Sequence, residues 1–306
     1  MNWALALALP LAWSLDALFG EPRNRFHPVA WLGAVLAPLG RRISTQPPWG
    51  AFVAGAIAWS AIALTVGLAA WWWQQVLLRD PTPWWCLLWL ALMLKPCFAW
   101  RMLRDEVRAV EQALSRDGLE AARGRLARLV SRDVQRFDEC QIRETAIETL
   151  AENLNDSVVA PLVWYAIAGL PGAVVYRFAN TADAMWGYRG RYEWAGKWAA
   201  RADDALSWLP ARITAWLISP ICSPTAWRTL RAEAARTPSP NGGWPMGAMA
   251  LALGVRLGKP GVYLLHPAGS APGRAHIERA LQVATWAAHA AMVLATAAWL
   301  LRGAWS

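Results

Sequence analysis

Three glutamates at four-residue spacing carry the first chemical signal in the chain. The segment ETAIETLAENLNDSVVAPLVW, residues 144–164, holds Glu144, Glu148 and Glu152, followed by Asn153 and Asp156. On a helix of 3.6 residues per turn the three glutamates share one face, and no Lys or Arg lies on that face to offset their mutual repulsion. Carboxylate and amide oxygens suit Mg²⁺, which proteins hold with one or two carboxylates together with substrate phosphates. We therefore predict metal ligands at Glu148, Glu152, Asn153 and Asp156, against the alternative of a solvated face on an amphipathic helix.

A second polar cluster occupies residues 176–212, where arginines alternate with aromatic residues and aspartates. Arg binds phosphate and carboxylate groups bidentately, and aromatic rings cover flat ligands. The alternative is an interfacial belt of Trp, Tyr and Arg at the level of the lipid headgroups. Such a belt would explain Trp194 and Trp198 but not the adjacent pair Asp203 and Asp204. The residues predicted to bind substrate or phosphate here are Arg177, Asn180, Asp183, Tyr188, Arg189, Arg201 and Arg212.

Two Pro-rich stretches add one candidate each. The segment LDALFGEPRNRFHPVAWLG, residues 15–33, carries His27, and SPNGGWP, residues 239–245, carries Asn241. Asn-Gly-Gly between prolines is a turn signal, and an ordinary turn is the simpler interpretation of both stretches. The backbone N–H groups of the second turn would also suit an anion. His27 and Asn241 are therefore predicted to bind substrate, against the alternative that both are structural.

The elements that position these residues belong to a membrane protein. The chain has 306 residues, of which 56% are hydrophobic and 23 are Trp, and its mean hydropathy is +0.22. Four apolar runs approach the length of about 20 residues that a bilayer core requires, and they predict spans at about 1–19, 51–78, 83–99 and 281–301. No basic residue precedes the first run, so it is interpreted as a retained span. Neither the four Cys nor the four His residues show metal-ligand or disulfide spacing, and no phosphate-binding Walker A motif occurs.

The placement of basic residues predicts the orientation of these spans. Of the 30 Lys and Arg residues, all but Arg79, Lys95 and Arg302 lie in residues 20–50 and 100–280. By the positive-inside rule both of these segments face the cytoplasm and both termini face outside. Lys95 lies near a span end and is expected to snorkel toward the headgroups. The net charge of +9 then reflects topology, and nucleic-acid binding is not expected because no basic patch accompanies a reading motif.

The predicted fold class is all-α, a polytopic membrane helix bundle that forms one domain over residues 1–306 with about four full spans. Residues 100–156 carry leucines and valines at helical spacing and are expected to form cytoplasmic amphipathic helices. A Gly-Leu-Pro-Gly stretch at 169–172 interrupts the apolar run that follows, so we expect broken or re-entrant helices over 157–222, packed inside the bundle. Residues 223–280 are rich in Pro and Gly and are expected to form a loop region, and the active site is expected within 100–280.

Taken in this order, these stretches resemble the integral-membrane cobinamide-phosphate synthases of cobalamin biosynthesis, the CobD/CbiB family. The resemblance covers nearly the whole chain. Its carriers are Asp16, Gly20, Pro22 and His27-Pro28-Val29; Arg132-Asp133; Glu148 through AENLNDSVVAPL; YRFANTADAMWGY; ADDALSWLPAR; and SPNGGWP. The chain departs from the family pattern at Ser207, at Ala30, where a basic residue is common, and at Arg189, where Lys is frequent.

The resemblance implies an enzyme that joins a propionate carboxylate of adenosylcobyric acid to (R)-1-amino-2-propanol or its O-phosphate. The family is described as dependent on ATP and Mg²⁺, and an acyl phosphate is the expected route of activation. Glu148 and Glu152 would then hold Mg²⁺ against ATP. Asp203 or Asp204 is predicted as a second metal ligand or as the base that accepts a proton from the attacking amine. These four acids are the predicted catalytic residues.

The resemblance also implies a multi-pass protein of the cell inner membrane, surrounded by lipid, with its active site facing the cytoplasm. A homo-oligomer and other enzymes of the corrinoid pathway are left open as partners. Two other functions also stay open. One is a membrane prenyltransferase-like enzyme using Mg²⁺-diphosphate, which the Asn153–Asp156 stretch and the Asp203-Asp204 pair loosely imitate. The other is a non-enzymatic transporter or scaffold, although the four apolar runs carry almost none of the polar groups that a transporter needs.

Overall fold

The computed structural model describes residues 2–79, 83–188, 190–219 and 223–304. In these residues helices dominate and one two-stranded sheet occurs, which confirms an all-α membrane protein. The sequence suggests a single domain, whereas the contacts divide the chain into two compact units. Unit 1 comprises Met1–Ala99, Ala160–Ser207 and Met292–Ser306, and unit 2 comprises Trp100–Val159 and Trp208–Ala291.

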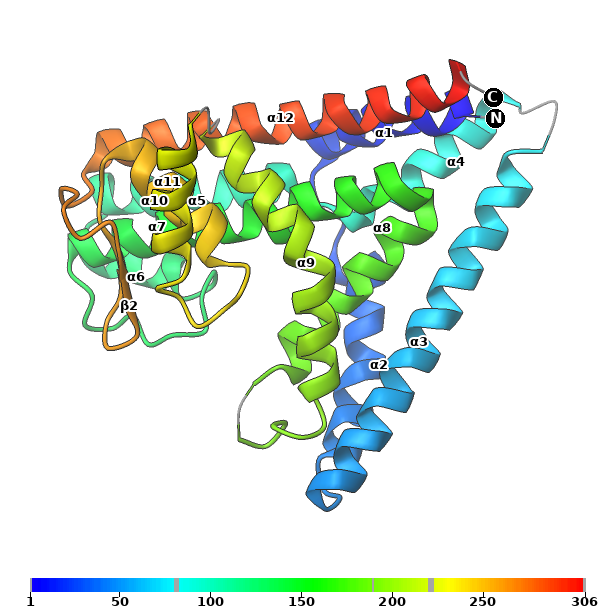
Figure 1. The fold of residues 1–306 in the computed structure, drawn as a ribbon, viewed down its shortest axis with the longest axis horizontal. Helices are drawn as coiled ribbons and strands as arrows, with labels where there is room; N and C mark the ends of the chain where they lie inside the picture. Colours follow the sequence, from blue (N-terminus) through cyan, green and yellow to red (C-terminus); the bar gives the residue numbers. More distant parts are fainter. Residues whose placement is uncertain (1, 80–82, 189, 220–222, 305–306) are drawn as a thin grey trace. The chain divides into compact units, whose positions relative to one another are not determined.

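Unit 1 is a bundle of apolar helices in which α3 packs along α8 and α1 packs against α4 (Figure 1). α3 is 30 residues long, carries no charged residue and has few buried residues, as expected of a helix that faces lipid. The elements of unit 1 are α1 (Asn2–Phe19), η1 (Asn24–Phe26), α2 (Pro28–Ile43), α3 (Pro48–Leu77), α4 (Trp84–Leu94), η2 (Lys95–Cys97), α8 (Ala160–Trp186), α9 (Lys197–Ile218) as far as Ser207, and the end of α12 (Arg274–Ala304).

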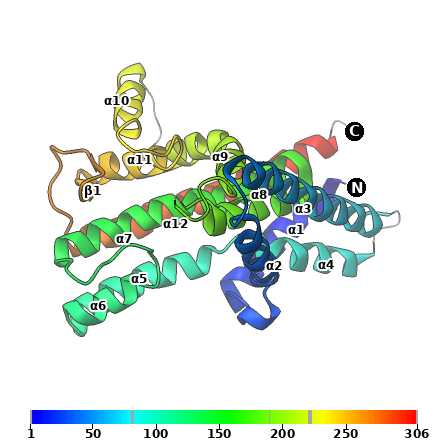
Figure 2. The same cartoon turned by 90° about the horizontal axis from the view of Figure 1, so that it is seen from below.

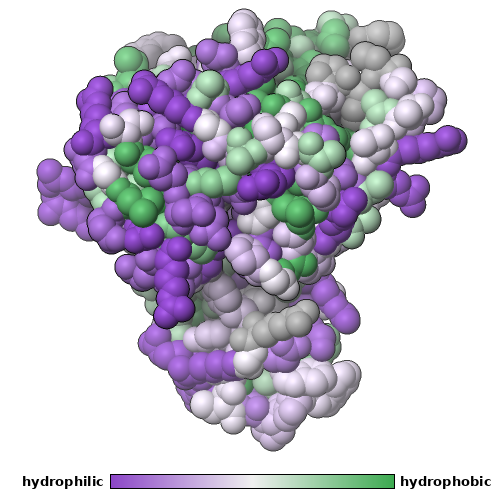
Figure 3. Space-filling model, turned by 90° about the vertical axis from the view of Figure 1, so that its left-hand side faces the viewer, coloured by the Kyte–Doolittle hydropathy of each residue, from purple (hydrophilic) through white to green (hydrophobic). Residues whose placement is uncertain are grey.

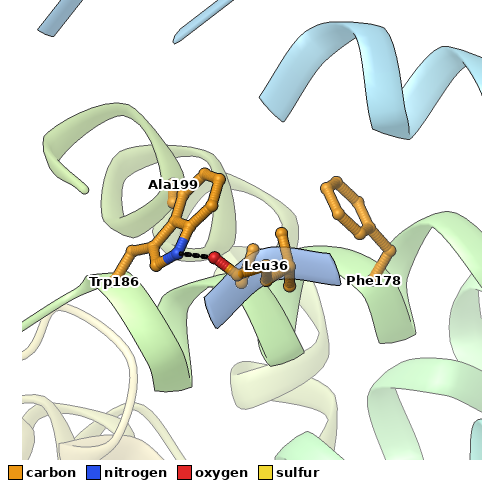
Figure 4. Packing of buried hydrophobic residues seen from close by; sticks show 5 residues of the cluster. Leu36, Phe178, Trp186 and Ala199 are labelled. Carbon is orange, nitrogen blue, oxygen red and sulfur yellow. Dashed lines mark hydrogen bonds between the residues drawn. The ribbon is translucent and has the colours of Figure 1, made fainter. Parts of the chain in front are cut away.

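A buried cluster joins α2, α8 and α9 within unit 1. Leu36, Phe178, Trp186 and Ala199 belong to it, and the Trp186 indole donates a hydrogen bond of 3.1 Å to the Leu36 carbonyl oxygen (Figure 4). A Cβ added at Gly40 would collide with the same indole. The bulky Trp186 and the absent side chain of Gly40 therefore bring α2 and α8 into close contact.

The predicted break in α8 is confirmed at Gly169. This glycine has φ 70° and ψ −152° inside the helix, a conformation that glycine adopts with little cost. Gln74 of α3 accepts the backbone N–H of Leu170 through its Oε1 atom at 2.8 Å, and Pro171 follows. A side chain of one helix thus satisfies the backbone group that the kink in the other releases.

Among the described residues, four helical segments are long and apolar enough to cross a membrane, and three of them overlap almost fully with the predicted spans at 51–78, 83–99 and 281–301. The other candidate takes in α8, where broken or re-entrant helices were expected. The first predicted span forms α1, which counts among the shorter apolar helices. The four segments are Pro48–Leu77, Trp84–Arg116, Glu139–Trp186 and Arg274–Ala304.

Lys95 does not snorkel as expected. Its side chain is 8% exposed and forms ion pairs with Asp16, at 2.9 Å, and with Glu21. Burial of a charge is costly unless it is paired, so the two acids account for the position of this lysine inside unit 1.

Unit 2 is built around α7, which packs against both α5 and α11 (Figure 2). A capping box starts α7, in which the Asp138 carboxylate accepts the Gln141 N–H while the Gln141 side chain accepts the Asp138 N–H. The elements of unit 2 are α5 (Trp100–Arg116), α6 (Leu119–Leu126), α7 (Glu139–Leu154), the π-helical turn η3 (Asn155–Val159), α9 from Trp208, α10 (Pro224–Ala234), α11 (Gly243–Leu253), β1 (Leu257–Lys259), β2 (Tyr263–Leu265) and the start of α12.

The expectation of a loop region over residues 223–280 is wrong. α10, α11 and an antiparallel hairpin fill much of it, with Leu257 opposite Leu265 and Lys259 opposite Tyr263. Figure 3 shows a largely hydrophilic surface on the side of Figure 1 that carries α6, α10 and β2. Helices are present over the predicted segment 100–156 as α5, α6 and α7, and α5 is clearly amphipathic.

Candidate active site

The glutamate face of α7 is not a solvated face. Glu148 is 1% exposed and Glu144 is 8% exposed, whereas Glu152 is exposed. A carboxylate that leaves water must gain a partner or a ligand to offset the cost of desolvation. The structure therefore excludes the simpler interpretation for two of the three glutamates.

Glu148 has one paired and one unpaired oxygen. Arg132 donates from Nη1 to Oε2 at 3.1 Å, while Oε1 is buried with no hydrogen-bond partner among the residues that the structure describes. Tyr263 of β2 lies beside the same carboxylate: burial, followed by the negative charge of Glu148 and a hydrogen bond with it, raises the pKa of the Tyr263 phenol. A cation or a protonated ligand group would satisfy the remaining oxygen.

Glu152 faces the SPNGG turn. A Cβ added at Gly242 would lie 3.3 Å from its Oε1 atom, so the missing side chain leaves the carboxylate accessible. Arg132 and Lys259 are the cations whose charges act on Glu152. Two acidic residues, two positively charged residues and one tyrosine therefore lie close together along this part of α7.

Glu144 has a separate partner. Arg256 donates from Nε to Glu144 Oε1 at 3.3 Å, and Cys140 contacts the same oxygen at 3.3 Å. Glu144 is therefore held in an ion pair one turn away from Glu148.

The two other predicted metal ligands are engaged locally. Asn153 donates from Nδ2 to the Thr149 carbonyl at 3.0 Å, and Asp156 accepts from Asn155 Nδ2 at 2.7 Å. Asn155 Oδ1 in turn accepts from Thr214 at 2.9 Å. Asn155 and Asp156 begin the π-helical turn η3, a kind of irregularity that often accompanies functional sites.

Within residues 2–79, 83–188, 190–219 and 223–304, no three His, Cys, Asp or Glu side chains form a metal-binding cluster. Mg²⁺ does not require one, because proteins commonly hold it with one or two carboxylates plus substrate phosphates. The unpaired Glu148 oxygen and the neighbouring Glu152 fit that donor set. Asn153 and Asp156 stay predictions.

Arg212 and Asn241, two predicted site residues, contact each other directly. Arg212 donates from Nη1 to Asn241 Oδ1 at 3.0 Å and to the Trp208 carbonyl, and its guanidinium lies over the rings of Trp208 and Trp244. Burial lowers the pKa of the Arg212 guanidinium. Arg212 thereby fixes the SPNGG turn, and its predicted contact with substrate stays a prediction.

The SPNGG turn offers fewer backbone donors than expected. The N–H groups of Asn241 and Gly242 both donate to Ser239 Oγ, at 3.2 and 3.1 Å. The turn therefore satisfies two of the donors that an anion nest would need.

The other predicted site residues lie in unit 1. Asp204 of α9 is close enough to Asp183 of α8 for their charges to interact, and burial raises the pKa of Asp204. Tyr176 and Ser207 share a hydrogen bond of 2.9 Å, so the residue that departs from the family pattern has a structural partner. Predicted site residues not brought into a cluster here are Asn180 and Asp203, which are half-buried, and Tyr188 and Arg201, which are exposed; Arg189 lies outside the described residues.

His27 uses both ring nitrogens within the protein. Nδ1 accepts the Val29 N–H at 3.2 Å and so caps α2, and Nε2 lies 2.6 Å from Glu21. This pattern assigns the proton to Nε2. The structural alternative therefore accounts for His27 fully, and its substrate contact stays a prediction.

Sequence reasoning missed three residues of the Glu148 site. The sequence singles out Arg132 only through its resemblance to a family motif, and it predicts a loop region around Lys259 and Tyr263. The available signal was the lack of a cation on the α7 face, which implies that cations must come from elsewhere in the fold. Nothing in the sequence spacing indicated which ones.

Comparison with known proteins identifies relatives over nearly the full length. The family model described as CobD/Cbib protein matches residues 9–292. A "Cobalamin biosynthesis protein CobD" of Stutzerimonas stutzeri is 40% identical over 304 residues, covering 95% of both chains. A "Probable cobalamin biosynthesis protein CobD" of Thermococcus kodakarensis is 39% identical over 287 residues, covering 92% of this chain and 91% of the relative. No solved structure matches significantly.

Proposed function

Because the chain belongs to the CobD/Cbib family, we propose that this membrane enzyme of cobalamin biosynthesis is an acid–amine ligase. It joins a propionate carboxylate of adenosylcobyric acid to (R)-1-amino-2-propanol or its O-phosphate through an amide bond, with ATP as co-substrate and Mg²⁺. The family match lends no support to the prenyltransferase and transporter alternatives. The protein lies in the inner membrane with its active site toward the cytoplasm.

The observation that carries the proposal is the Glu148 carboxylate, which is buried, held on one oxygen by Arg132, and left with an unpaired second oxygen. A buried carboxylate oxygen without a partner is costly, and a bound cation would offset that cost. With Glu152 it supplies the two carboxylates that Mg²⁺ with nucleotide phosphates would need. The ion would neutralise phosphate charge there.

The chemistry of amide formation explains why basic residues surround these acids. A free carboxylate does not react with an amine, so the carboxylate first takes the terminal phosphoryl group of ATP and ADP leaves. The amine then attacks the acyl phosphate, phosphate leaves, and the nitrogen loses its proton. The charges of Arg132 and Lys259 act on Glu152, and we propose that both side chains hold phosphate oxygens, which guanidinium and ammonium groups bind well.

The proton of the attacking amine needs an acceptor. Asp204 and Asp203 are the proposed candidates, or else they bind a second metal ion. Burial raises the pKa of Asp204, which makes it a better base than an exposed aspartate would be. Arg201 and Arg189 are proposed to hold anionic groups of the substrates.

The decisive experiment is an assay of the purified full-length protein with adenosylcobyric acid, ATP and Mg²⁺, adding each amino-alcohol separately. We expect ADP release that depends on both organic substrates, and an amide product detected by mass spectrometry. ADP release without an amide product, or amide formation without ATP, would overturn the proposal. Comparison of the two amino-alcohols identifies the natural one.

A further inference from the structure

Unit 1 contains an apolar cavity of about 390 Å³ between α2, α3, α4, η2 and α8, with one charged residue in its lining. That residue is Arg177. The lining of the cavity also includes Pro28, Val66, Trp73 and Cys97. The volume lies within the range of small-molecule sites, which are mostly apolar with a few polar groups that fix the ligand's orientation.

Arg177 has no acid partner among the described residues. Its Nε atom is buried with no hydrogen-bond partner. Lys95, another buried cation of unit 1, differs from Arg177, because Asp16 and Glu21 neutralise it. An ionisable side chain in an apolar part of a membrane protein usually has a functional partner, and here the protein supplies none.

The geometry points to an anionic phospholipid of the surrounding bilayer as the ligand of this cavity, with its phosphate on Arg177 and part of an acyl chain against the apolar walls. The shared chemistry is an anion attached to an alkyl chain. Two indoles of the lining, Trp73 and Trp89, are substantially exposed, and Trp side chains favour the headgroup level of a bilayer. A guanidinium holds a phosphate bidentately.

The apolar lining also indicates that the substrates of the proposed reaction do not bind in this cavity. ATP and an amide-rich corrin would lose hydrogen bonds to water in an apolar cavity without recovering them. This inference replaces the predicted contact of Arg177 with substrate by a contact with lipid. It does not rest on the proposed function, because its test measures binding and not turnover.

The test uses purified full-length protein in detergent micelles and a phosphatidylglycerol whose acyl chain carries a photoreactive diazirine. After irradiation, mass spectrometry maps the labelled peptides. We expect labelling concentrated in residues 66–73, 89–97 and 170–177. Unlabelled phosphatidylglycerol should compete, and neutral diacylglycerol should compete at least about tenfold less, which corresponds to about 1.4 kcal/mol of binding free energy.

Substitutions distinguish the contribution of the Arg177 charge to lipid binding from the contribution of the apolar cavity. Arg177→Gln should reduce labelling about tenfold, and Arg177→Lys should restore part of it. The matched control is Arg191→Gln, which removes an exposed arginine of the same unit. Val174→Phe fills the cavity one turn from Arg177 and should also reduce labelling, which keeps the test valid if Arg177→Gln folds poorly.

Three results would overturn the inference. These are labelling spread evenly along the exposed length of α3, equal competition by diacylglycerol, and labelling that both Arg177→Gln and Val174→Phe leave unchanged. Competition by oleate but not by phosphatidylglycerol would overturn the phospholipid and assign a fatty-acid carboxylate to the cavity. The labelling measures lipid binding only, so the expected labelling pattern is the same whether or not the protein shows ligase activity in the assay described above.

Discussion

A glutamine at position 148 would keep an oxygen for Arg132 while removing the negative charge. We expect Glu148→Gln to insert and fold normally but to lose at least about 100-fold in turnover, or roughly 2.7 kcal/mol of transition-state stabilisation. Steady-state kinetics at saturating Mg²⁺ measure the loss. The control is Glu139→Gln on the same helix, whose side chain is 65% exposed and whose loss should matter little. Near-normal turnover in Glu148→Gln would show that the buried carboxylate is only structural.

Substitution of Glu152 distinguishes a role in metal binding from a general effect of its negative charge on turnover. Because this glutamate is exposed and faces Gly242, Glu152→Gln should raise the Mg²⁺ concentration needed for half-maximal activity while leaving thermal stability unchanged. A titration of activity with Mg²⁺ measures this. An unchanged Mg²⁺ requirement together with reduced turnover would remove Glu152 from the metal site.

Glu21 gives the protein a stability that depends on pH. Burial opposes ionisation of this carboxyl, but His27 and Lys95 outweigh it and lower the pKa of Glu21 below 4.5. Because the folded pKa lies below the unfolded one, the stabilisation is fully present above pH 4.5 and is lost as the pH falls through the folded value. The difference in melting temperature between wild type and Glu21→Gln should therefore shrink on acidification below pH 4.5. The exposed control Glu278→Gln should show no such trend, and a difference that grows on acidification would contradict the assignment.

The spacing of Glu144, Glu148 and Glu152 is enough to predict that the three glutamates share one face of α7, because helical periodicity is a local property. The partners could not be predicted. Arg132 precedes Glu148 by 16 residues and Arg256 follows Glu144 by 112, and such separations are set by the tertiary fold. The same reason explains why the contact between Arg212 and Asn241, 29 residues apart, could not be predicted.

At the scale of the element, the kink of α8 provides a test of helix packing. Gly169→Ala should lower stability by about 1–2 kcal/mol, because alanine is strained at positive φ and its Cβ would collide with the Gln74 carboxamide. Gln74→Leu should cost about 1–3 kcal/mol by leaving the buried Leu170 N–H unsatisfied. Thermal unfolding in detergent measures both. The control is Gly124→Ala, where the added Cβ meets no atom within 4 Å; equal effects at positions 124 and 169 would contradict the argument.

The kink was predictable because Gly and Pro act locally on the backbone. The opposite error occurred at residues 223–280, where frequent Gly and Pro suggested a loop. In the structure Pro224 starts α10 at a position where a missing N–H costs nothing, and Gly254 ends α11 with φ 69°. These residues mark the ends of elements and do not exclude helices between them.

At the scale of the whole molecule, the orientation in the membrane decides which groups meet cytoplasmic ATP. We predict that both termini face outside and that residues 100–280 face the cytoplasm. Single cysteines introduced at Asp117 and Tyr188 should react with an impermeant maleimide only after the membrane is opened, whereas one at Trp84 should react in intact cells. Labelling of position 188 from outside would show that the candidate span containing α8 crosses completely, and would overturn the re-entrant arrangement.

The ion pairs of Lys95 have a consequence for biogenesis. α1 leaves the ribosome well before η2, so Asp16 and Glu21 enter the membrane environment before Lys95, with which both form ion pairs, has been synthesised. Until Lys95 arrives, the Asp16 carboxylate, 1% exposed in the finished protein, lacks the ammonium group that offsets the cost of its burial there. The first helix can therefore settle only when the fourth has been made, and a nascent chain released before residue 95 should be recovered as a substrate of membrane proteases.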